Sequence, residues 1–438
     1  MTDIYFRTDG NSEIATGHLM RCLAIARACA RMGAAVAFIV SDEESLSLLR
    51  ERFAVPQEFQ VCSLHTDFKN PEQEIPALLS CPLLCSADNA VGAPENVLRR
   101  NTVDADAPAV PDVFHVRPWL FIDSYYATPA YFQALRSCFR VAYLDDLRSI
   151  DCAVDLLINY DTEEPCACYD HAARRLLGPR CTPLRRQFDN VCYEVRPTAG
   201  DVLLSTGGTD PYRIAETLLT ILYPEYGPAD CGSAAGSLSL LRERFYAMQP
   251  ARFKSESLPL LRSLHYHVLT SRSNTRYEAL QALAQVCPSV HIHTDVKEVA
   301  ALMASCDLAV SAGGTTLCEL CAVGVPSVSY LMAENQRTVV ESYEKKQLIP
   351  CAGDIRSTDR SEIPADSVSC CVHNSAANVS AHPDRENAVL PDLHTIGRIL
   401  GFLADMTQNA AARAAVSAAM RNFLDGSGAD RIAAALIQ

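Results

Sequence analysis

A histidine near the start of the chain stands where a general base could act. Residues 7–27 read RTDGNSEIATGHLMRCLAIAR: a polar loop, then Gly17 and His18, then apolar residues at three- and four-residue spacing. This spacing predicts a helix with one apolar face, so His18 is expected at or near the helix N-terminus. The unpaired N–H groups and positive dipole end found there favour a neutral imidazole that can accept a proton. The alternative is a histidine that only hydrogen-bonds within its own loop.

Two glycine loops later in the chain have the composition of phosphate-binding turns. Residues 206–211 read TGGTDP after the apolar run DVLLS, and residues 311–324 read SAGGTTLCELCAVG after DLAV. Glycine lets the backbone approach a ligand closely, and Thr315 or Thr316 is expected to cap the following helix. The N–H groups at such a helix start can hold a diphosphate without a metal ion. Glu319, one turn further, is expected within reach of ribose hydroxyl groups, although a glycine pair also occurs for packing alone.

Polar residues also follow a strongly predicted strand in the first half of the chain. Asp123 and Tyr125 come directly after the apolar run PWLFI. Ligand groups gather at the carboxyl ends of strands in open α/β sheets, so both residues are placed for function. The structural alternatives are that Asp123 only closes the strand and that Tyr125 belongs to the core.

The residues predict neither a metal site nor a cofactor. The 19 cysteines are scattered without the compact pairs of a four-ligand zinc site, so reduced, buried thiols are expected. Asp145 and Asp146 could form a metal pair, but adjacent carboxylates are more typical of a solvated turn with a capping role. His291 and His293 alternate on one predicted strand, where a surface or packing role outweighs metal binding.

Strands that alternate with helices surround these residues and indicate two domains with mostly parallel sheets. Strands are predicted at 4–6, 35–40, 118–123, 140–144 and 155–159, and then at 201–205, 267–270, 290–293, 307–310 and 325–328. A polar linker divides the chain into an N-terminal domain, residues 1–196, and a C-terminal domain, residues 197–438. Three stretches without periodicity, 81–117, 223–263 and 352–391, are predicted to be irregular insertions.

Composition limits the class of protein. The 438 residues suffice for two cores, and 49% hydrophobic with 21% charged residues is typical of a soluble protein. A net charge of −14 argues against nonspecific nucleic-acid binding. No run approaches the roughly 20 apolar residues that a membrane helix needs. The N-terminus does not resemble a signal peptide. We therefore expect a cytoplasmic protein with neither nucleic-acid nor membrane partners.

The opening RTDGNSEIATGHLMR resembles the start of the nucleotide-sugar hydrolases of pseudaminic acid biosynthesis, which hydrolyse UDP-2,4-diacetamido-2,4,6-trideoxy-β-L-altropyranose. Segments that agree in the first half are FIDSYY at 121–126, YLDDL at 143–147, VDLLINYD at 154–161 and LLGPRCTPLRRQF at 176–188. Those in the second half are LLSTGGTDP at 203–211, LMASCDLAVSAGGTTLCEL at 302–320, YLMAENQ at 330–336 and DGSGADRI at 425–432. The resemblance therefore covers both predicted domains.

The resemblance implies an α/β fold of GT-B architecture, in which two Rossmann-like domains face each other across a cleft. The family's catalytic histidine falls on His18, which would activate a water molecule in the N-terminal domain. The C-terminal domain would bind the UDP of the UDP-sugar substrate, and no cofactor is implied. Because a UDP anion leaves readily, one general base suffices for direct attack at the anomeric carbon with inversion.

The resemblance also implies a set of substrate-binding residues. Those in the N-terminal domain are Asp9, Gly17, Arg21, Asp123 and Tyr125. Those in the C-terminal domain are Gly313, Gly314, Thr315 and Thr316 at the diphosphate, Glu319 at the ribose, Gly207, Gly208 and Asp210 nearer the cleft, and Asn335 and Gln336 at the sugar. For Asp9 the structural alternative is a residue that only caps a turn.

Three functions stay open on the sequence alone. The first is hydrolysis of this sugar nucleotide or of a related UDP-diacetamido sugar. The second is a GT-B glycosyltransferase, although no apolar or basic patch for a lipid acceptor is evident. The third is a nucleotide-sugar-binding protein without catalysis, against which His18 and the phosphate loop both weigh. A monomer is the expectation, but the oligomeric state and the roles of the insertions stay open.

Overall fold

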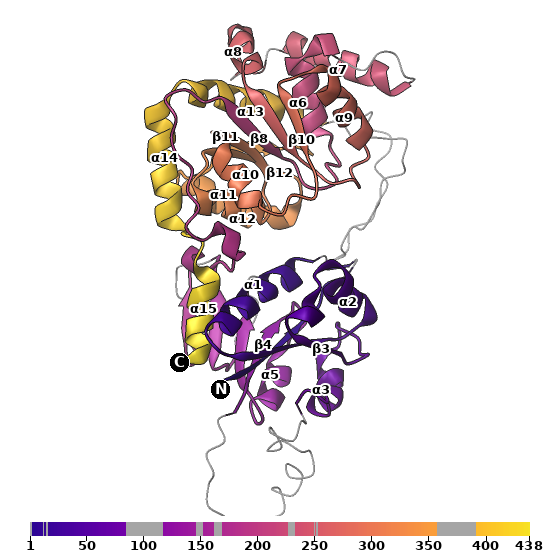
Figure 1. Cartoon of the computed structure of the whole chain (residues 1–438), viewed down its shortest axis with the longest axis vertical. Helices are drawn as coiled ribbons and strands as arrows, with labels where there is room; N and C mark the ends of the chain where they lie inside the picture. The colour runs from indigo at the N-terminus through magenta and orange to yellow at the C-terminus, as the bar shows by residue number, and fades with distance from the viewer. Residues whose placement is uncertain are drawn as a thin grey trace, which may run out of the picture. The chain divides into compact units, whose positions relative to one another are not determined.

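The computed structural model describes residues 2–11, 13–14, 16–84, 117–145, 152–161, 169–226, 233–248, 250, 253–356 and 391–438. The chain forms two compact units, one of Met1–Arg186 with Gly426–Gln438 and one of Gln187–Asp425. Each unit has one parallel sheet with helices packed on it (Figure 1). Within the described residues, no helix combines the length and the apolar character needed to cross a membrane. The cytoplasmic location and the monomeric state stay predictions.

The N-terminal unit contains a seven-stranded sheet in the order β3-β2-β1-β4-β5-β6-β7. Its strands are β1 (Asp3–Thr8), β2 (Ala35–Val40), β3 (Gln60–Ser63), β4 (Trp119–Asp123), β5 (Arg140–Leu144), β6 (Leu156–Asn159) and β7 (Arg175–Leu177). Its α-helices are α1 (Gly17–Arg31), α2 (Glu43–Ser47), α3 (Pro71–Leu79), α5 (Pro129–Leu135) and α15 (Gly428–Ile437).

The sheet of this unit separates two apolar layers. Successive residues of a strand point to opposite faces, so β1 sends Ile4 and Phe6 into one cluster and Tyr5 into the other. The first cluster includes the apolar faces of α1 and α15, and the second includes those of α3 and α5. Strands that are buried on both faces read as continuous apolar runs, which explains why β2, β4 and β5 are evident in the sequence.

The C-terminal unit contains a six-stranded sheet in the order β10-β9-β8-β11-β12-β13. Its strands are β8 (Asp201–Ser205), β9 (His265–Leu269), β10 (Val290–His293), β11 (Leu308–Ala312), β12 (Ser327–Leu331) and β13 (Cys351–Asp354). Its α-helices are α6 (Ile214–Leu222), α7 (Ser233–Met248), α8 (Leu258–Arg262), α9 (Tyr277–Val286), α10 (Val299–Ser305), α11 (Thr316–Val323), α12 (Arg337–Lys345), α13 (Leu393–Thr407) and α14 (Ala410–Phe423).

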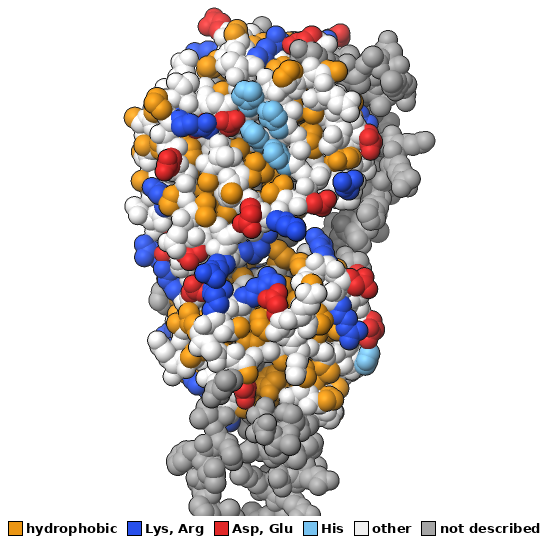
Figure 2. Space-filling model, viewed as in Figure 1, with side chains coloured by type: hydrophobic (Ala, Val, Ile, Leu, Met, Phe, Trp, Pro, Cys, Tyr) orange, Lys and Arg blue, Asp and Glu red, His pale blue; other side chains and the backbone are white. Residues whose placement is uncertain are grey.

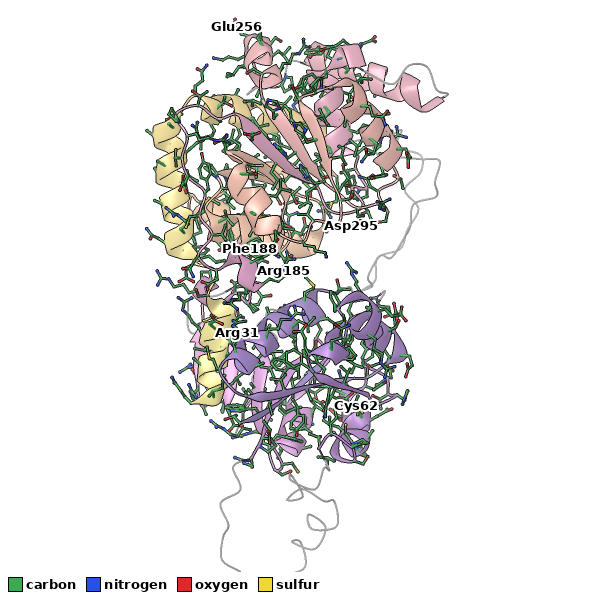
Figure 3. All side chains as sticks on the ribbon, in the orientation of Figure 1. Arg31, Cys62, Arg185, Phe188, Glu256 and Asp295 are labelled. Carbon is green, nitrogen blue, oxygen red and sulfur yellow. The ribbon has the colours of Figure 1, made fainter. Side chains whose placement is uncertain are left out.

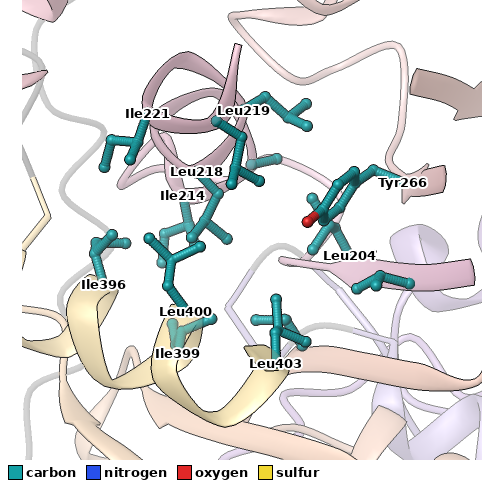
Figure 4. Packing of buried hydrophobic residues seen from close by; sticks show 14 of the residues in the cluster. Leu204, Ile214, Leu218, Leu219, Ile221, Tyr266, Ile396, Ile399, Leu400 and Leu403 are labelled. Carbon is teal, nitrogen blue, oxygen red and sulfur yellow. The ribbon is translucent and has the colours of Figure 1, made fainter. Parts of the chain in front are cut away.

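Helices α6 and α13 supply much of the core on one face of this sheet. Figure 4 shows Leu218 of α6 and Leu400 of α13 on the facing sides of the two helices, and Leu204 of β8 belongs to the same buried cluster. All three side chains are at most 1% exposed. Full burial of a leucine contributes about 1.5–3 kcal/mol, so the burial of such side chains helps to hold both helices on the sheet.

Both sheets reverse their strand order at one point. In the N-terminal unit the reversal lies between β1 and β4, and in the C-terminal unit it lies between β8 and β11. The connections that follow the two strands on either side of such a reversal lead to opposite faces of the sheet. In open α/β sheets this leaves a crevice at the carboxyl ends of those strands. Helix α1, which begins with Gly17 and His18, follows β1, and the two glycine pairs follow β8 and β11.

The predicted strands at 35–40, 140–144 and 201–205 coincide with β2, β5 and β8, and the other predicted strands overlap observed ones. The domain limits differ from the prediction. The chain enters the second unit at Gln187 rather than at residue 197, and from Gly426 it belongs to the first unit again. An apolar helix face in a sequence does not reveal its partner, which is why α15 was assigned to the wrong domain.

Helix α15 packs against α1 in the N-terminal core. Its residues Ile432 and Leu436 are fully buried in the same cluster as Leu23 of α1. At the end of α1, the Arg31 guanidinium, labelled in Figure 3, forms an ion pair of 2.5 Å with Asp430 of α15. The last segment of the chain therefore completes the first unit.

The predicted insertions are only partly irregular. Residues 223–263 include helices α7 and α8, and Phe245 and Leu261 lie in the C-terminal core, so the prediction of an irregular stretch is wrong for these segments. Strand β13 likewise falls at the start of the stretch 352–391. Residues 85–116 and 357–390, which make up most of the other two insertions, lie outside the described residues.

We expect Leu436→Ala to destabilise the N-terminal unit by about 2–5 kcal/mol, because it removes a fully buried side chain from the α1–α15 contact. Hydrogen exchange followed by mass spectrometry should become faster in β1 to β7 and stay unchanged in β8 to β13. Gln438→Ala, at the exposed last residue, is the control. Unchanged exchange in the N-terminal strands would contradict the placement of α15 in this unit.

Candidate functional site

The carboxyl ends of β1 and β4 bring the predicted base together with a carboxylate. Thr8 at the end of β1 lies opposite Asp123 at the end of β4, and His18 is the second residue of α1, which follows β1. His18 Nδ1 is 2.6 Å from Asp123 Oδ1, and both side chains are buried. The predicted position of His18 at a helix start is confirmed, whereas its bond to Asp123 joins residues 105 positions apart.

The hydrogen bonds around His18 define its tautomer. A carboxylate oxygen can only accept, so the 2.6 Å contact requires the proton on Nδ1 of His18. Arg21 Nη2 also lies 3.0 Å from this nitrogen, but it donates to Asp123 Oδ1 at 2.5 Å instead. The proton on Nδ1 leaves the lone pair of the ring on Nε2, as a general base requires.

Arg21 stabilises the charge on Asp123. Its Nε donates to Asp123 Oδ2 at 2.6 Å, so that the guanidinium and the carboxylate form a two-pronged pair. Burial alone would raise the pKa of Asp123, but Arg21 and His18 outweigh it and hold that pKa well below its ordinary value. Asp123 is therefore an anion at any pH near neutrality.

Arg21 was predicted to bind substrate, and its described contacts are within the protein. Beyond Asp123, its Nη1 donates to the hydroxyl group of Tyr160 at 2.7 Å. The sequence reading missed Tyr160, although this residue directly follows the predicted strand 155–159 and so lies at the same edge of the sheet. Arg21 and Tyr160 together position the carboxylate that orients His18.

A small hollow adjoins the His18 ring. Its volume is about 10 Å³, which corresponds to roughly one water molecule. Tyr125 covers it with a ring that meets the His18 ring edge-on at 4.4 Å between centroids, and Tyr125 is 43% exposed rather than part of the core. The exposed Gly17 precedes His18 at the helix start. The residues that line the hollow are Asp9, Ile14, His18, Phe68, Asp123, Ser124, Tyr125 and Tyr126.

Asp9 lines this hollow, but its carboxylate is bonded to the protein. Oδ1 accepts from the backbone N–H of Ser41 at 2.7 Å and from its hydroxyl group at 2.9 Å, and Oδ2 accepts from Arg7 at 2.5 Å. Arg7 in turn donates to both carboxylate oxygens of Glu74, at 2.8 and 2.6 Å. This buried network was not predicted from the sequence. The charged residue Arg7, which follows the apolar residues of strand β1, is the signal that could have indicated it. Asp9 therefore fixes the loop after β1.

In the C-terminal unit, the ends of β8, β11 and β12 lie side by side. Gly313 follows β11, and a side chain there would overlap Cγ2 of Val340 and lie 3.0 Å from Cβ of Gln336. The Gln336 amide oxygen accepts from the backbone N–H of Met332 at 3.0 Å. The structure thus brings together the predicted residues Gly313 and Gln336, and it gives Gln336 the role of holding the loop after β12. Asn335 belongs to the same turn, but its side chain is outside the described set.

The turn from β11 into α11 has open space at its second glycine. A side chain at Gly314 would meet nothing within 4 Å. The N–H groups of Gly313 and Gly314 donate to the carbonyl groups of Tyr330 and Ala312, so the amides left for an anion are those of Thr315 and Thr316. Thr315 occupies the N-cap position before Thr316, the first helical residue, as predicted, but its side chain makes no capping hydrogen bond. Glu319 lies in the first turn of α11, as predicted.

The loop after β8 contains the other glycine pair. Gly207 has φ +87°, a backbone conformation that favours glycine. The carbonyl oxygen of Gly208 accepts from the hydroxyl group of Ser271 at 2.7 Å, which ties this loop to the end of β9. Asp210 was predicted to bind substrate, but it is 2% exposed and its two oxygens accept from the N–H groups of Ile214 and Ala215, each at 3.0 Å. Its role is to cap α6.

Two further carboxyl groups, Asp210 in the C-terminal unit and Asp145 in the N-terminal unit, are buried. Burial raises the pKa of Asp210 to about 6, although the two α6 amides act in the opposite direction. Asp145 is buried as well and accepts from the Tyr169 hydroxyl group at 3.2 Å, so the predicted solvated turn is wrong for this residue, while Asp146 is outside the described part of the chain. Across the described ranges, no group of three or more His, Cys, Asp or Glu side chains is arranged to hold a metal ion.

Comparison with solved structures shows the fold. MurG of Acinetobacter baumannii is similar at a TM-score of 0.54 and 10% sequence identity, over 100% of this chain and 99% of that protein. The glycotransferase of kitacinnamycin is similar at a TM-score of 0.50 and 14% identity, over 99% and 98% of the two chains. The predicted GT-B architecture of two Rossmann-like α/β domains is confirmed. No family model and no curated protein matches the sequence.

We expect Gly313→Ala and Gly314→Ala to differ in stability. The alanine at 313 overlaps Val340 and should cost about 1–3 kcal/mol, whereas the alanine at 314 points into open space and should stay within about 0.5 kcal/mol of wild type. Guanidinium unfolding of the two variants measures the difference. Equal stabilities would contradict the described packing of the turn.

Asp210 should make the C-terminal unit less stable as the pH rises. Its pKa of about 6 in the folded protein exceeds the value of about 4 in an unfolded chain, so the folded state binds the extra proton between these values. The free energy of unfolding should fall by about 2 kcal/mol from pH ~4 to pH ~6 through this group. Asp210→Asn should remove this fall in the unfolding free energy, measured by guanidinium unfolding at several pH values across that range. The same dependence on pH in the variant and the wild type would contradict the assignment.

Proposed function

We propose that the protein is an enzyme acting on a nucleotide sugar, and that it hydrolyses UDP-2,4-diacetamido-2,4,6-trideoxy-β-L-altropyranose to the free sugar and UDP. The observation that carries the proposal is the 2.6 Å bond between His18 Nδ1 and Asp123 Oδ1 at the carboxyl ends of β1 and β4. A histidine oriented by a buried carboxylate is the arrangement of a general base. The resemblance of the sequence supplies the identity of the sugar.

The proposed reaction needs one base. A water molecule gives a proton to Nε2 of His18 while its oxygen attacks the anomeric carbon of the sugar. The bond between that carbon and the UDP oxygen breaks on the opposite side, so the configuration inverts and UDP leaves as an anion. Asp123 stabilises the imidazolium that forms. A glycosidase needs a general acid because an alkoxide leaves poorly, and a diphosphate does not have this difficulty.

The glycine turn before α11 supports a nucleotide diphosphate as the leaving group. The space beside Gly314 and the amides of Thr315 and Thr316 suit a phosphate oxygen at the positive end of the helix. Neutralising charge that develops on the diphosphate accelerates its departure. The kitacinnamycin glycotransferase, which by its name transfers a sugar, has a similar fold, and this is consistent with an enzyme that acts on a nucleotide sugar.

A second candidate function is transfer of the sugar to an acceptor other than water. The observation that favours it is the fold shared with the kitacinnamycin glycotransferase. In that reaction His18 would deprotonate an acceptor hydroxyl group. The hollow beside His18, about 10 Å³, has room for roughly one water molecule, the nucleophile that the proposed hydrolysis needs.

The reaction can be tested with the UDP-linked altropyranose in oxygen-18 water. NMR and mass spectrometry should find UDP without label and an inverted sugar that carries oxygen-18 at the anomeric position. Label on UDP would mean attack at phosphorus and would exclude the role of His18. UDP release that requires an added acceptor would favour the transferase, and absence of turnover with this sugar would refute the proposed substrate.

Removing the base should separate catalysis from binding. We expect His18→Ala to lower turnover on the order of a hundredfold or more while the UDP affinity in calorimetry stays within about twofold, because His18 contacts no nucleotide in this proposal. Asp123→Asn should also lower turnover, since it removes the acceptor that fixes the tautomer. His65→Ala, an exposed histidine of the same unit, is the control. Equal losses of turnover and UDP affinity in His18→Ala would contradict the assigned role.

A further inference from the structure

Four histidines form a row on the surface of the C-terminal unit. His265 and His267 lie on β9, and His291 and His293 lie on the neighbouring strand β10 (Figure 2). His267 and His291 are directly paired in the parallel register. The alternate residue Tyr266 is fully buried, which leaves the imidazole rings on the opposite, accessible face of the sheet. We call these four residues the histidine ladder.

The rings of the histidine ladder contact one another through their nitrogens. His265 Nδ1 is 3.3 Å from His291 Nε2, and His267 Nδ1 is 3.0 Å from His293 Nε2. The rings stack with centroids 5.0 to 5.6 Å apart. From the sequence, His291 and His293 share a face, but their partners on β9 come from a segment more than 20 residues away and depend on the strand register.

Asp201 fixes the tautomer of one ring. Its Oδ1 is 3.0 Å from His267 Nε2, and its Oδ2 is bound by Arg196 at 2.9 Å. Burial raises the pKa of Asp201, but the bonds from His267 and Arg196 outweigh it and lower that pKa, so this group is a carboxylate. It therefore accepts a hydrogen bond from the Nε2–H group of His267, and the lone pair of this ring is on Nδ1, which faces His293.

Metal-binding histidines commonly have this arrangement, in which the second ring N–H is held by a carboxylate. We propose that His267 Nδ1 and His293 Nε2 together bind a divalent transition-metal ion of the kind that prefers imidazole, such as Ni²⁺. The ion takes the place of the proton shared by the two nitrogens, and His293 then carries its proton on Nδ1. This site is distinct from the proposed catalytic site, and no step of the reaction depends on it.

The spacing of the two nitrogens matches such an ion. With metal–nitrogen bonds of about 2.1 Å, nitrogens 3.0 Å apart subtend roughly a right angle at the metal. Right angles suit the tetragonal geometry of Ni²⁺ or Cu²⁺ better than the tetrahedral geometry of Zn²⁺. The described residues offer no three-ligand group, so the protein supplies two ligands and water completes the coordination.

Arg196 places a positive charge next to the ladder, and it pairs with Asp201. Arg196 also pairs with Asp307, so its positive charge is shared between two carboxylates. Because β10 is an edge strand of the sheet, an ion that joins it to β9 should stabilise that edge.

The test is calorimetric titration of the full chain, without an affinity tag, with NiCl2. Ni²⁺ is chosen because thiolates compete less for it than for Zn²⁺. Near pH 7 we expect about one equivalent to bind and to raise the unfolding temperature, and at about pH 5 binding should be lost because protonated rings cannot ligate. MgCl2, a hard cation that prefers oxygen ligands, should give no binding at the ladder.

Three variants decide whether the ladder is the site. His293→Gln should weaken Ni²⁺ binding at least tenfold, and Asp201→Asn should weaken it roughly 10- to 100-fold by releasing the His267 tautomer. His65→Gln, an exposed histidine of the other unit, should bind like wild type. Absence of Ni²⁺ binding in the wild type, or the same affinity in His293→Gln, would overturn the proposal, and neither result bears on the hydrolysis test.

Discussion

The buried carboxylate of Asp123 is the group on which the N-terminal site depends. Removing an anion from water costs several kcal/mol unless other groups compensate for the lost hydration. Here the two-pronged bond from Arg21 provides the compensating charge, and the His18 N–H and the Cys22 thiol complete the donors. A neutral acid in this position would not hold the proton of His18 on Nδ1. The lone pair on Nε2 therefore depends on an ion pair on the far side of the carboxylate.

The strand order of the two sheets explains why the candidate residues fall where they do. The strand order of each sheet reverses once, between β1 and β4 and between β8 and β11. Asp123 ends β4, His18 stands at the start of α1 after β1, and the two glycine pairs follow β8 and β11. The two units use this crevice differently. In the first, buried charged side chains converge on one histidine, whereas in the second, glycines leave backbone and space for a ligand.

Buried ion networks hold the loops at both crevices. Arg7 of β1 joins Asp9 and Glu74 beneath the loop that leads to His18. In the C-terminal unit, Glu216 of α6 accepts from Arg276 at 2.7 and 2.9 Å and from Arg213 at 2.8 Å, which ties the segment after β9 to the start of α6. Buried ion pairs contribute little net stability, but breaking one costs about 3–5 kcal/mol. Such networks therefore restrict the loops to one arrangement.

The sequence alone determined the alternation of strands and helices, the helix start at His18 and the two glycine turns, because these features depend on local periodicity and on residues next to one another. It also placed Asp123 and Tyr125 at a strand end. Tertiary structure decided the rest. It showed that Arg21 pairs with Asp123, that Asp210 accepts from the first amides of α6, and that α15 belongs to the first unit. The Arg21–Asp123 pair and the contact between α15 and α1 each depend on a partner distant in the sequence, since burial makes an unpaired charge or an uncovered apolar face costly wherever its partner lies in the chain.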